Sequence, residues 1–242
     1  MTAAPPLAGL PGGPASGAND DSDDEVEHLQ YKVIVVGDGA VGKTSLINRF
    51  TQGGFAQSYK QTIGVDFFNK KIQLPGNINV TMQIWDIGGQ QVGGKMLGKY
   101  IYGCAAVIFV YDVTNPETFK NVDDWYDFVV REFKADKRPY MALVGNKNDL
   151  QHLRQVKPEK HSLYAIEHQM IPHQVSAKTG DRVQSLFTRV AADLAGVQLT
   201  RSEVEQTDVV VTAAIVQHPA APVPDGPRGP QPEKEESSCA VQ

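Results

Sequence analysis

The sequence predicts a doubly wound α/β domain, in which helices cover both faces of a mostly parallel six-stranded sheet with one antiparallel strand. Two observations predict this fold class. Short β-branched runs alternate with helical patterns along residues 31–200. Three of these runs are apolar almost throughout, which is typical of strands buried on both faces of a parallel sheet. With 242 residues and 41% hydrophobic composition, the chain has enough apolar material for one sizeable core.

Six segments have strand patterns. The three runs expected to be buried are YKVIVVG (31–37), AVIFVYD (106–112) and YMALVGN (140–146). NVTMQIWD (79–86) alternates apolar and polar side chains and is expected to be half-buried. It follows DFFNKKIQL (66–74) after the turn signal LPGN (74–77), so these two strands are expected to form the antiparallel hairpin. IPHQV (171–175) is the last strand.

Helical patterns fill the gaps between the strands. They cover residues 43–52, 116–133, 157–169 and 181–195. Asn115-Pro116 precedes the second of these helices and is a typical helix-start signal. Because parallel strands end at one edge of the sheet, the ligand of such a fold is expected at the carboxyl ends of the strands.

The two ends of the chain differ from its centre. Residues 1–30 combine a Pro/Gly/Ala run with six acidic and no basic residues, so we expect a disordered acidic arm there. Residues 199–242 are polar and Pro-rich and are expected to form a flexible tail after a domain that covers residues 31–198. Residues 31–200 carry 20 basic against 15 acidic residues. This mild surplus of positive charge suits an anionic small ligand. The sequence lacks the dense basic stripe of a nucleic-acid-binding protein, so no nucleic-acid partner is expected.

The chain has two cysteines, Cys104 and Cys239, in unlike contexts. A disulfide framework is therefore not expected, and a reducing cytosol is the default compartment. No signal-peptide pattern opens the chain, and no run of about 18 apolar residues predicts a membrane span. Cys104 and Trp125 are expected to lie in the core, and none of the six histidines has the spacing of a metal ligand.

The loop after the first strand reads GDGAVGKT (37–44), which matches the phosphate-loop pattern G-x-x-x-x-G-K-[ST] between a strand and a helix. Its glycines let successive N–H groups turn inward onto a phosphate at the positive end of the helix. Lys43 supplies a point charge to the outer phosphates, and the Thr44 hydroxyl can ligate Mg²⁺. A glycine-rich turn with an incidental lysine is the alternative. The loop residues expected to contact nucleotide are Gly37, Gly39, Ala40, Val41, Gly42, Lys43, Thr44 and Ser45.

Two further motifs predict which base is held. NKND (146–149) follows the third buried strand and SAK (176–178) follows the last strand, so both lie at the same sheet edge as the phosphate loop. A carboxylate at Asp149 can accept from two neighbouring donors of guanine, whereas adenine presents an acceptor there. A polar site left unpaired in this way discriminates by about 10⁴ to 10⁵. The methylenes of Lys147 can cover the purine face. The sequence therefore favours GTP over ATP.

Together, GDGAVGKT, QTIGVDF (61–67), WDIGGQ (85–90), NKND and SAK resemble the Ras-superfamily small GTPases, which have a three-layer P-loop NTPase fold. The segment IGVDF, with aromatic residues at Phe67, Trp85 and Tyr100, is similar to the Rab branch. The resemblance covers about residues 31–200. Shorter motifs, LPGN, GGKML, KYIYG, VKPEK and the terminal CAVQ, further resemble a divergent type of Rab.

The resemblance implies a monomer that switches between GTP and GDP on membrane surfaces, with Mg²⁺ as cofactor. In this family Thr62 of switch I completes the Mg²⁺ shell, Asp86 holds the metal through water, and Gln90 orients the attacking water. The catalytic residues so implied are Gln90, Lys43 and Thr62, and the metal residues are Thr44, Thr62 and Asp86. The implied nucleotide contacts beyond the phosphate loop are Phe55 beside the guanine, Tyr59, Thr62, Gly89, Asn146, Lys147, Asp149, Ser176, Ala177 and Lys178.

The segment IWDIGGQQVGGKML (84–97) is rich in glycine. Such a segment can be ordered by contacts with a γ-phosphate and Mg²⁺ and can slacken when hydrolysis removes them. Most Rabs have Thr-Ala where this chain has Ile87-Gly88, and Glu-Arg where it has Gln91-Val92. No arginine occurs from Thr51 to Tyr100, so we expect slow intrinsic hydrolysis and acceleration by a GTPase-activating protein. Effector proteins and an exchange factor are the other implied partners.

The chain ends in Cys239-Ala-Val-Gln, which fits the C-a-a-X pattern, and the terminal glutamine predicts farnesylation of Cys239. Lys234 is the one basic residue near it, among acidic neighbours, so no polybasic patch assists the lipid. One prenyl chain alone gives reversible attachment. We therefore expect a protein shared between the cytosol and the cytoplasmic face of membranes.

Three function classes share a phosphate loop: a hydrolysing switch enzyme, a guanine-nucleotide-binding adaptor that hydrolyses GTP poorly, and a P-loop kinase or ATPase. Thr44, Thr62, Asp86 and Gln90 are all of the type competent for hydrolysis, which favours the switch enzyme. Asp149 and the lack of a lid-like arginine cluster disfavour the third class. We expect a Rab-type regulator of intracellular membrane trafficking.

Overall fold

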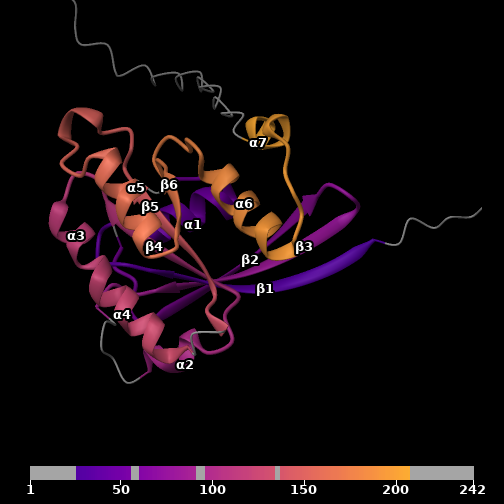
Figure 1. The fold of residues 1–242 in the computed structure, drawn as a ribbon, viewed down its shortest axis with the longest axis horizontal. Coiled ribbons are helices and arrows are strands. Elements are labelled where there is room, and N and C mark those ends of the chain that lie inside the picture. The colour runs from indigo at the N-terminus through magenta and orange to yellow at the C-terminus, as the bar shows by residue number, and fades with distance from the viewer. Residues whose placement is uncertain (1–25, 56–59, 91–95, 134–136, 208–242) are drawn as a thin grey trace, which may run out of the picture. The chain divides into compact units, whose positions relative to one another are not determined.

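The computed structural model describes residues 26–55, 60–90, 96–133 and 137–207. A sheet of six strands forms the middle of this part, in the order β2-β3-β1-β4-β5-β6 (Figure 1). These strands pair in parallel except for β2 and β3, which form an antiparallel hairpin. The strands are β1 (Glu27–Val36), β2 (Val65–Leu74), β3 (Ile78–Ile87), β4 (Ala106–Asp112), β5 (Tyr140–Asn146) and β6 (Ile171–Gln174). The predicted fold class is confirmed.

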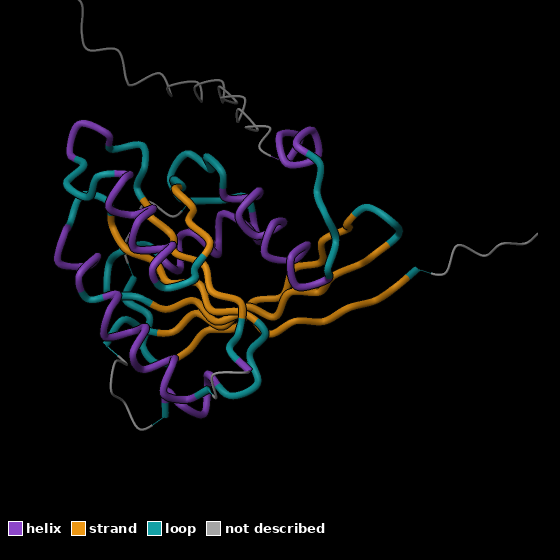
Figure 2. Tube along the Cα trace, viewed as in Figure 1, coloured by secondary structure: helices purple, strands orange, loops and turns teal. Residues whose placement is uncertain are grey.

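Helices cover both faces of the sheet, so the fold has three layers (Figure 2). The helices are α1 (Lys43–Gln52), α2 (Leu97–Ile101), α3 (Pro116–Lys120), α4 (Val122–Glu132), α5 (Pro158–Glu167), α6 (Val183–Ala195) and α7 (Arg201–Thr207), with a 3₁₀ turn η2 (Gln151–Leu153). One core lies under α1 and α6, where Ile47 and Phe187 pack. The other lies under α2 to α5, where Ile101 and Phe119 pack. No helix in the described part of the chain is long and apolar enough to cross a membrane.

Side chains of β1 point alternately into the two cores, one on each face of the sheet. Side chains alternate across a strand, so Val33 and Val35 pack under α1 and α6 while Ile34 and Val36 pack on the opposite face. All four side chains are fully buried. Burying one such aliphatic side chain contributes about 1.5 to 3 kcal/mol. The loop after β1, which carries the phosphate motif, therefore starts from a strand that is anchored on both faces.

Most predicted elements begin and end within about two residues of the bounds that their patterns indicate. The strands at 106–112 and 140–146 and the helix at 43–52 begin and end as predicted. The hairpin turn between β2 and β3 places Gly76 at φ 80° and Asn77 at φ 57°, a left-handed conformation that these two residue types tolerate. Cys104 and Trp125 are buried, as predicted.

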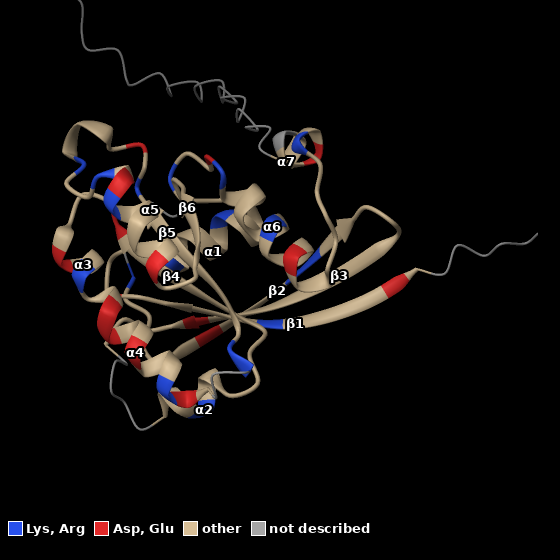
Figure 3. Cartoon of the chain, viewed as in Figure 1, with Lys and Arg blue, Asp and Glu red and all other residues tan. Residues whose placement is uncertain are grey.

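The predicted helix over 116–133 is two helices, α3 and α4, interrupted at Asn121. The side chain of Asn121 donates to Asp38 Oδ2 at 2.7 Å and is therefore bound to the loop after β1 rather than to its own helix. Asp123 and Asp124 occupy the first turn of α4, where negative charge is favourable (Figure 3). The contact between Asn121 and Asp38 at the break joins distant segments of the chain, so hydrophobic periodicity does not reveal it.

Two elements extend beyond the predicted domain limits of 31–198. Residues 27–30, assigned to the disordered arm 1–30, pair with β3 as the start of β1. A strand needs only a backbone partner, and the long β3 supplies one in spite of their polar side chains. α7 lies within the predicted flexible tail 199–242. Its start is a capping box, because the Thr200 N–H donates to Glu203 Oε2 at 2.7 Å and the Glu203 N–H donates to Thr200 Oγ1 at 3.4 Å.

Candidate nucleotide-binding site

A cavity of about 1080 Å³ opens at the carboxyl ends of β1, β3, β5 and β6, and its volume suits a ligand of nucleotide size. The predicted site residues that line it are Gly39, Ala40, Gly42, Lys43, Thr44, Ser45, Phe55, Thr62, Gly89, Gln90, Asn146, Lys147, Asp149, Ala177 and Lys178. Gly37, Val41, Asp86 and Ser176 contact these residues from beneath. Tyr59 and Cys239 lie outside the described residues. Residues that the sequence did not single out also line the cavity: Asn48, Lys60, Gln61, Ile63, Asp66 and Leu150.

The phosphate loop turns sharply between β1 and α1, and two glycines make the turn possible. Gly37 has φ 135°, and a Cβ there would lie 2.1 Å from the carbonyl oxygen of Val110. Gly42 has φ 95°, and a Cβ there would lie 2.4 Å from Nδ2 of Asn146. No larger residue fits at either position without moving its neighbours. The loop is therefore packed tightly against β4 and the NKND motif.

Lys43 is a buried cation at the bottom of this loop, with 6% of its surface exposed. Its Nζ donates to the carbonyl oxygens of Gly37 and Asp38 at 2.7 and 2.8 Å. Burial lowers the pKa of Lys43 to about 8, and the nearby carboxylates of Asp86 and Asp38 oppose that shift. An anion in the cavity would stabilise the charged form of Lys43. The position therefore suits phosphate oxygens.

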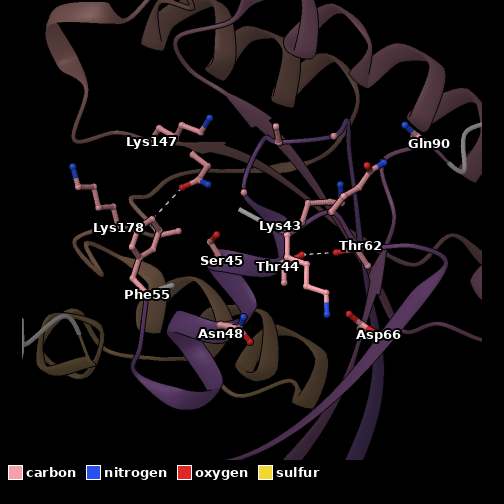
Figure 4. A pocket seen from close by; sticks show the side chains of 18 of the residues that line it. Lys43, Thr44, Ser45, Asn48, Phe55, Thr62, Asp66, Gln90, Lys147 and Lys178 are labelled. Atoms are coloured by element: carbon pink, nitrogen blue, oxygen red, sulfur yellow. Dashed lines mark hydrogen bonds between the residues drawn. The ribbon is translucent and has the colours of Figure 1, made fainter. Parts of the chain in front are cut away.

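Asp86 lies near the end of β3 and is fully buried. Its Oδ2 accepts hydrogen bonds from the hydroxyls of Thr44 and Thr62, and those two hydroxyl oxygens are 2.8 Å apart (Figure 4). Its Oδ1 has no hydrogen-bond partner among the described residues. Burial raises the pKa of Asp86, and the hydrogen bond from Thr44 and the charge of Lys43 oppose that shift. An unpartnered carboxylate oxygen beside two hydroxyls is an all-oxygen donor set that fits a hard divalent cation such as Mg²⁺.

The base-reading motifs meet the phosphate loop through Asn146, which is 1% exposed. Its Nδ2 donates to the carbonyl oxygen of Val41 at 2.8 Å, and its Oδ1 accepts from the N–H of Ala177 at 3.0 Å. The Ser176 hydroxyl donates to Asp149 Oδ1 at 2.6 Å and so fixes the carboxylate that is expected to face guanine. Phe55, Lys147 and Lys178 lie at one end of the cavity, and Thr62 and Gln90 lie at the other (Figure 4). One cavity therefore joins the residues expected to hold phosphate and Mg²⁺ to the residues expected to hold the base.

Comparisons with known proteins agree with this geometry. Residues 32–195 match the model of the Ras family. Ras-related protein Rab-28 of Caenorhabditis elegans is 43% identical over 200 residues, which cover 82% of this chain and 81% of the relative. Ras-related protein rab-39 of the same organism is 34% identical over 169 residues, which cover 69% of this chain and 74% of the relative. The chain is a Rab-family small GTPase. The resemblance inferred from its motifs, including the narrower one to a divergent Rab, is confirmed.

This GTPase brings together the three aromatic residues that carried the Rab resemblance. Phe67 and Trp85 meet edge to face with ring centroids 4.6 Å apart, and Trp85 and Tyr100 are 6.3 Å apart. Phe67 is 62% exposed. The ammonium of Lys32 lies 3.9 Å from the centre of the Trp85 ring and adds a cation–π contact. Family members bind guanine nucleotides, regulators and effectors. The exposed Phe67 of this aromatic group follows switch I closely in the chain.

Sequence reasoning missed Asp112, which supports Lys147 of the GTPase. Asp112 is the last residue of β4, and its Oδ2 pairs with Nζ of Lys147 at 2.5 Å. Burial alone would raise the pKa of Asp112, but hydrogen bonds from Lys147 and Thr114 hold it below its ordinary value. The rule that ligand-side residues follow the ends of parallel strands could have singled out Asp112.

Two other supporting residues carried no sequence signal. Arg49 of α1 donates to the carbonyl oxygens of Ala177 and Lys178, and thus holds the SAK loop. Asp38 of the phosphate loop accepts hydrogen bonds from Asn121 and Trp125. Each contact joins segments more than 80 residues apart in the chain. Such pairings arise from the tertiary fold and from no local pattern.

Proposed function

We propose that this Rab-family GTPase binds GTP with Mg²⁺ in the cavity described above, hydrolyses it slowly and acts as a switch in membrane trafficking. The observation that carries the proposal is one cavity lined by Lys43, by the Thr44 and Thr62 hydroxyls that bond to Asp86, and by Asp149. A guanosine triphosphate with a divalent cation matches that arrangement of charge along its length.

Each end of the cavity has its own role in the proposal. The N–H groups of the phosphate loop and the ammonium of Lys43 hold the β- and γ-phosphates. Asp149, positioned by Ser176, accepts from the two donors of guanine, and Phe55 and Lys147 flank the base. This division makes the triphosphate the source of affinity and the base the source of selectivity.

Mg²⁺ belongs to the same proposal. Thr44 and Thr62 would ligate it through their hydroxyls, and Asp86 would hold it through water, because Oδ2 of Asp86 bonds to both hydroxyls while Oδ1 of the same carboxylate has no partner among the described residues. When bound, the metal neutralises charge on the outer phosphates. Thr62 then couples the metal to switch I, so the loss of the terminal phosphate changes the order of that segment.

Hydrolysis needs a positioned water and neutralisation of developing charge. Gln90 lies at the phosphate end of the cavity and orients the water in this proposal. None of the described residues that line the cavity is an arginine. An arginine supplied by a GTPase-activating protein would therefore raise the rate by about 10³ to 10⁵.

A single-turnover assay with GTP and ATP side by side tests the proposed function. We expect binding and slow hydrolysis of GTP and no measurable binding of ATP. The Gln90→Leu variant should hold GTP but hydrolyse it about 10²-fold more slowly, because the water loses its orientation. Turnover of several GTP per second by the purified protein alone would contradict the need for an activating protein.

For attachment to membranes, we propose farnesylation of Cys239 and reversible partition of a monomeric protein between the cytosol and the cytoplasmic face of membranes. The support is the terminal sequence CAVQ without a neighbouring polybasic patch.

A further inference from the structure

Gly88 is a buried glycine directly after β3. Its backbone does not require glycine, because its φ lies outside the left-handed region. Space is what excludes a side chain. A Cβ built at Gly88 would lie 2.7 Å from the carbonyl oxygen of Thr62 and 3.2 Å from that of Gly64. Both atoms belong to the backbone of switch I, so neither can move aside as the end of a flexible side chain could.

The contact fixes the place of switch I. The Gly88 N–H donates to the carbonyl oxygen of Gly64 at 2.9 Å. Within the same short segment, the Thr62 hydroxyl lies 2.8 Å from the Thr44 hydroxyl and 3.3 Å from Asp86 Oδ2. Switch I is thus held on two sides, by Gly88 through its backbone and by the proposed cation site through Thr62. A shift of the backbone at 62–64 would carry the Thr62 hydroxyl with it.

The neighbouring glycine faces a different element. A Cβ at Gly89 would lie 2.2 Å from the backbone nitrogen of Gly39 and 2.4 Å from the carbonyl carbon of Asp38, both in the phosphate loop. Two successive glycines therefore lie against two different loops. Gly88 packs against the backbone of switch I, and Gly89 packs against the backbone of the phosphate loop. Gly54 offers a contrast, because a Cβ there would meet nothing within 4 Å.

We propose that Gly88 is a positioning residue for the GTP-bound state, in which its missing side chain lets switch I lie directly against the end of β3 and places Thr62 at the cation. The proposal rests on the proposed function, because Thr62 gains its role only when Mg²⁺ and a terminal phosphate are bound. A ligand shifts an equilibrium only by its differential affinity for the two states. A side chain at position 88 should thus penalise the GTP state and leave the GDP state nearly unchanged.

The test compares the full-length protein with Gly88→Ala and with the control Gly54→Ala. Affinities for a non-hydrolysable GTP analogue and for GDP are measured with Mg²⁺ present. Gly88→Ala should lower the ratio of analogue to GDP affinity by about tenfold, with GDP affinity kept within about twofold, and Gly54→Ala should change neither. In a Thr62→Ala background the effect of Gly88→Ala on this ratio should shrink to about twofold, because the hydroxyl that it displaces is gone.

An unchanged ratio, or an equal loss of both affinities, would overturn the proposal for Gly88. If the unsubstituted protein bound neither nucleotide, the proposed function itself would be wrong, and the two failures are thereby distinguished. A measurement on the unsubstituted protein covers the case in which Gly88→Ala does not fold. The amide hydrogen of Gly88, which bonds to Gly64, should exchange more slowly with the analogue bound than with GDP bound. Equal exchange rates in the two states would also overturn the proposal.

Discussion

Arg49 shows how much one side chain can organise at this site. Its Nε donates to the carbonyl oxygen of Ala177 at 3.0 Å, its Nη2 donates to that of Lys178, and its Nη1 donates to that of Gly53 at 2.7 Å. A planar guanidinium can make these three bonds at once, whereas an ammonium cannot follow the same fork. Arg49 therefore ties the end of α1 to the loop that is expected to contact the base.

We predict that Arg49→Lys will raise the dissociation rate of GDP by about fivefold to thirtyfold, because hydrogen bonds from a charged donor contribute about 1.5 to 3 kcal/mol when buried and less when partly exposed. Release of a fluorescent GDP derivative measures the rate. Arg189→Lys is the matched control, because Arg189 pairs with Asp193 on the surface of α6. Equal rates in both variants would show that Arg49 does not hold the SAK loop.

At the scale of elements, α4 is connected to the phosphate loop through Asp38. Asn121 donates to Asp38 Oδ2 at 2.7 Å, and the indole N–H of the buried Trp125 donates to Asp38 Oδ1 at 3.2 Å. The same helix reaches α2, because a Cβ at Gly98 would lie 2.9 Å from an oxygen of Glu132. The segment that starts with Asn121 and continues through α4 therefore contacts the phosphate loop at its beginning and α2 at its end.

Trp125→Phe keeps most of the packing and removes the indole N–H. We predict that the free energy of unfolding will fall by about 1 to 3 kcal/mol, because a charged acceptor loses one donor and the smaller ring leaves a gap. Urea denaturation in the presence of GDP measures the change. Tyr126→Phe on the same helix is the control and should alter stability by about 0.5 kcal/mol or less. If Trp125→Phe lowered the free energy of unfolding no more than the control does, the hydrogen bond between Trp125 and Asp38 would not contribute to stability.

The sequence predicts elements well where local signals and burial agree. β4 and β5 are apolar throughout, and α1 lies between the phosphate loop and Gly53, so their bounds follow from pattern alone. Prediction fails where a distant partner decides, as at Asn121 and at the start of β1. The capping box at Thr200 is a different case, because its signal, a threonine three residues before a glutamate, is present in the sequence within a polar segment that predicts a flexible tail.

In the candidate site too, local sequence signals reveal some residues, and contacts with distant segments determine others. Motif residues such as Lys43 and Asp149 are recognisable because phosphate and guanine chemistry demand those groups at strand ends. The residues that support these motifs from other elements are not recognisable in this way. Arg49 and Asp38 act through contacts that depend on where α4, α6 and the SAK loop come to lie, and no spacing along the chain encodes those positions.

For the molecule as a whole, the buried His161 and the half-buried His173 make stability depend on pH. Burial lowers the pKa of both His161 and His173 to about 4. His161 Nδ1 pairs with the Tyr111 hydroxyl at 3.0 Å, and Arg154 also opposes its protonation. Arg189 opposes protonation of His173, whereas Asp193 favours it. The unfolded chain, with ordinary histidine pKa values near 6.5, takes up protons first as the pH falls.

We predict full stability above about pH 7 and a progressive loss between about pH 6.5 and 4, to which His161 contributes on the order of 3 kcal/mol. Urea denaturation at a series of pH values measures the loss. His161→Gln, which stays neutral and can still accept from Tyr111, should lose less stability over this range. The loss expected from the carboxylate of Asp112 comes at lower pH, because its pKa lies below its ordinary value. If the free energy of unfolding of His161→Gln fell with pH as steeply as that of the unsubstituted protein, His161 would not be the source of the pH dependence.

Attachment to membranes is also a property of the whole protein. We predict that Cys239→Ser will move the protein entirely into the soluble fraction of cells, because the prenyl acceptor is lost. Fractionation of cells that express the variant measures this, with Ser238→Ala as the control that keeps the cysteine. Persistence of the serine variant on membranes would refute the lipid anchor.

The amide of Asn146 has a thermodynamic consequence for ligand recognition. One side chain holds both the phosphate loop and the SAK loop, so a molecule that orders one loop lowers the cost of ordering the other. Guanosine and inorganic triphosphate, added as separate molecules, should each bind far more weakly than GTP, in which the two are covalently joined. Their joint occupancy should exceed the product of their individual occupancies, because each would prepare the site for its counterpart.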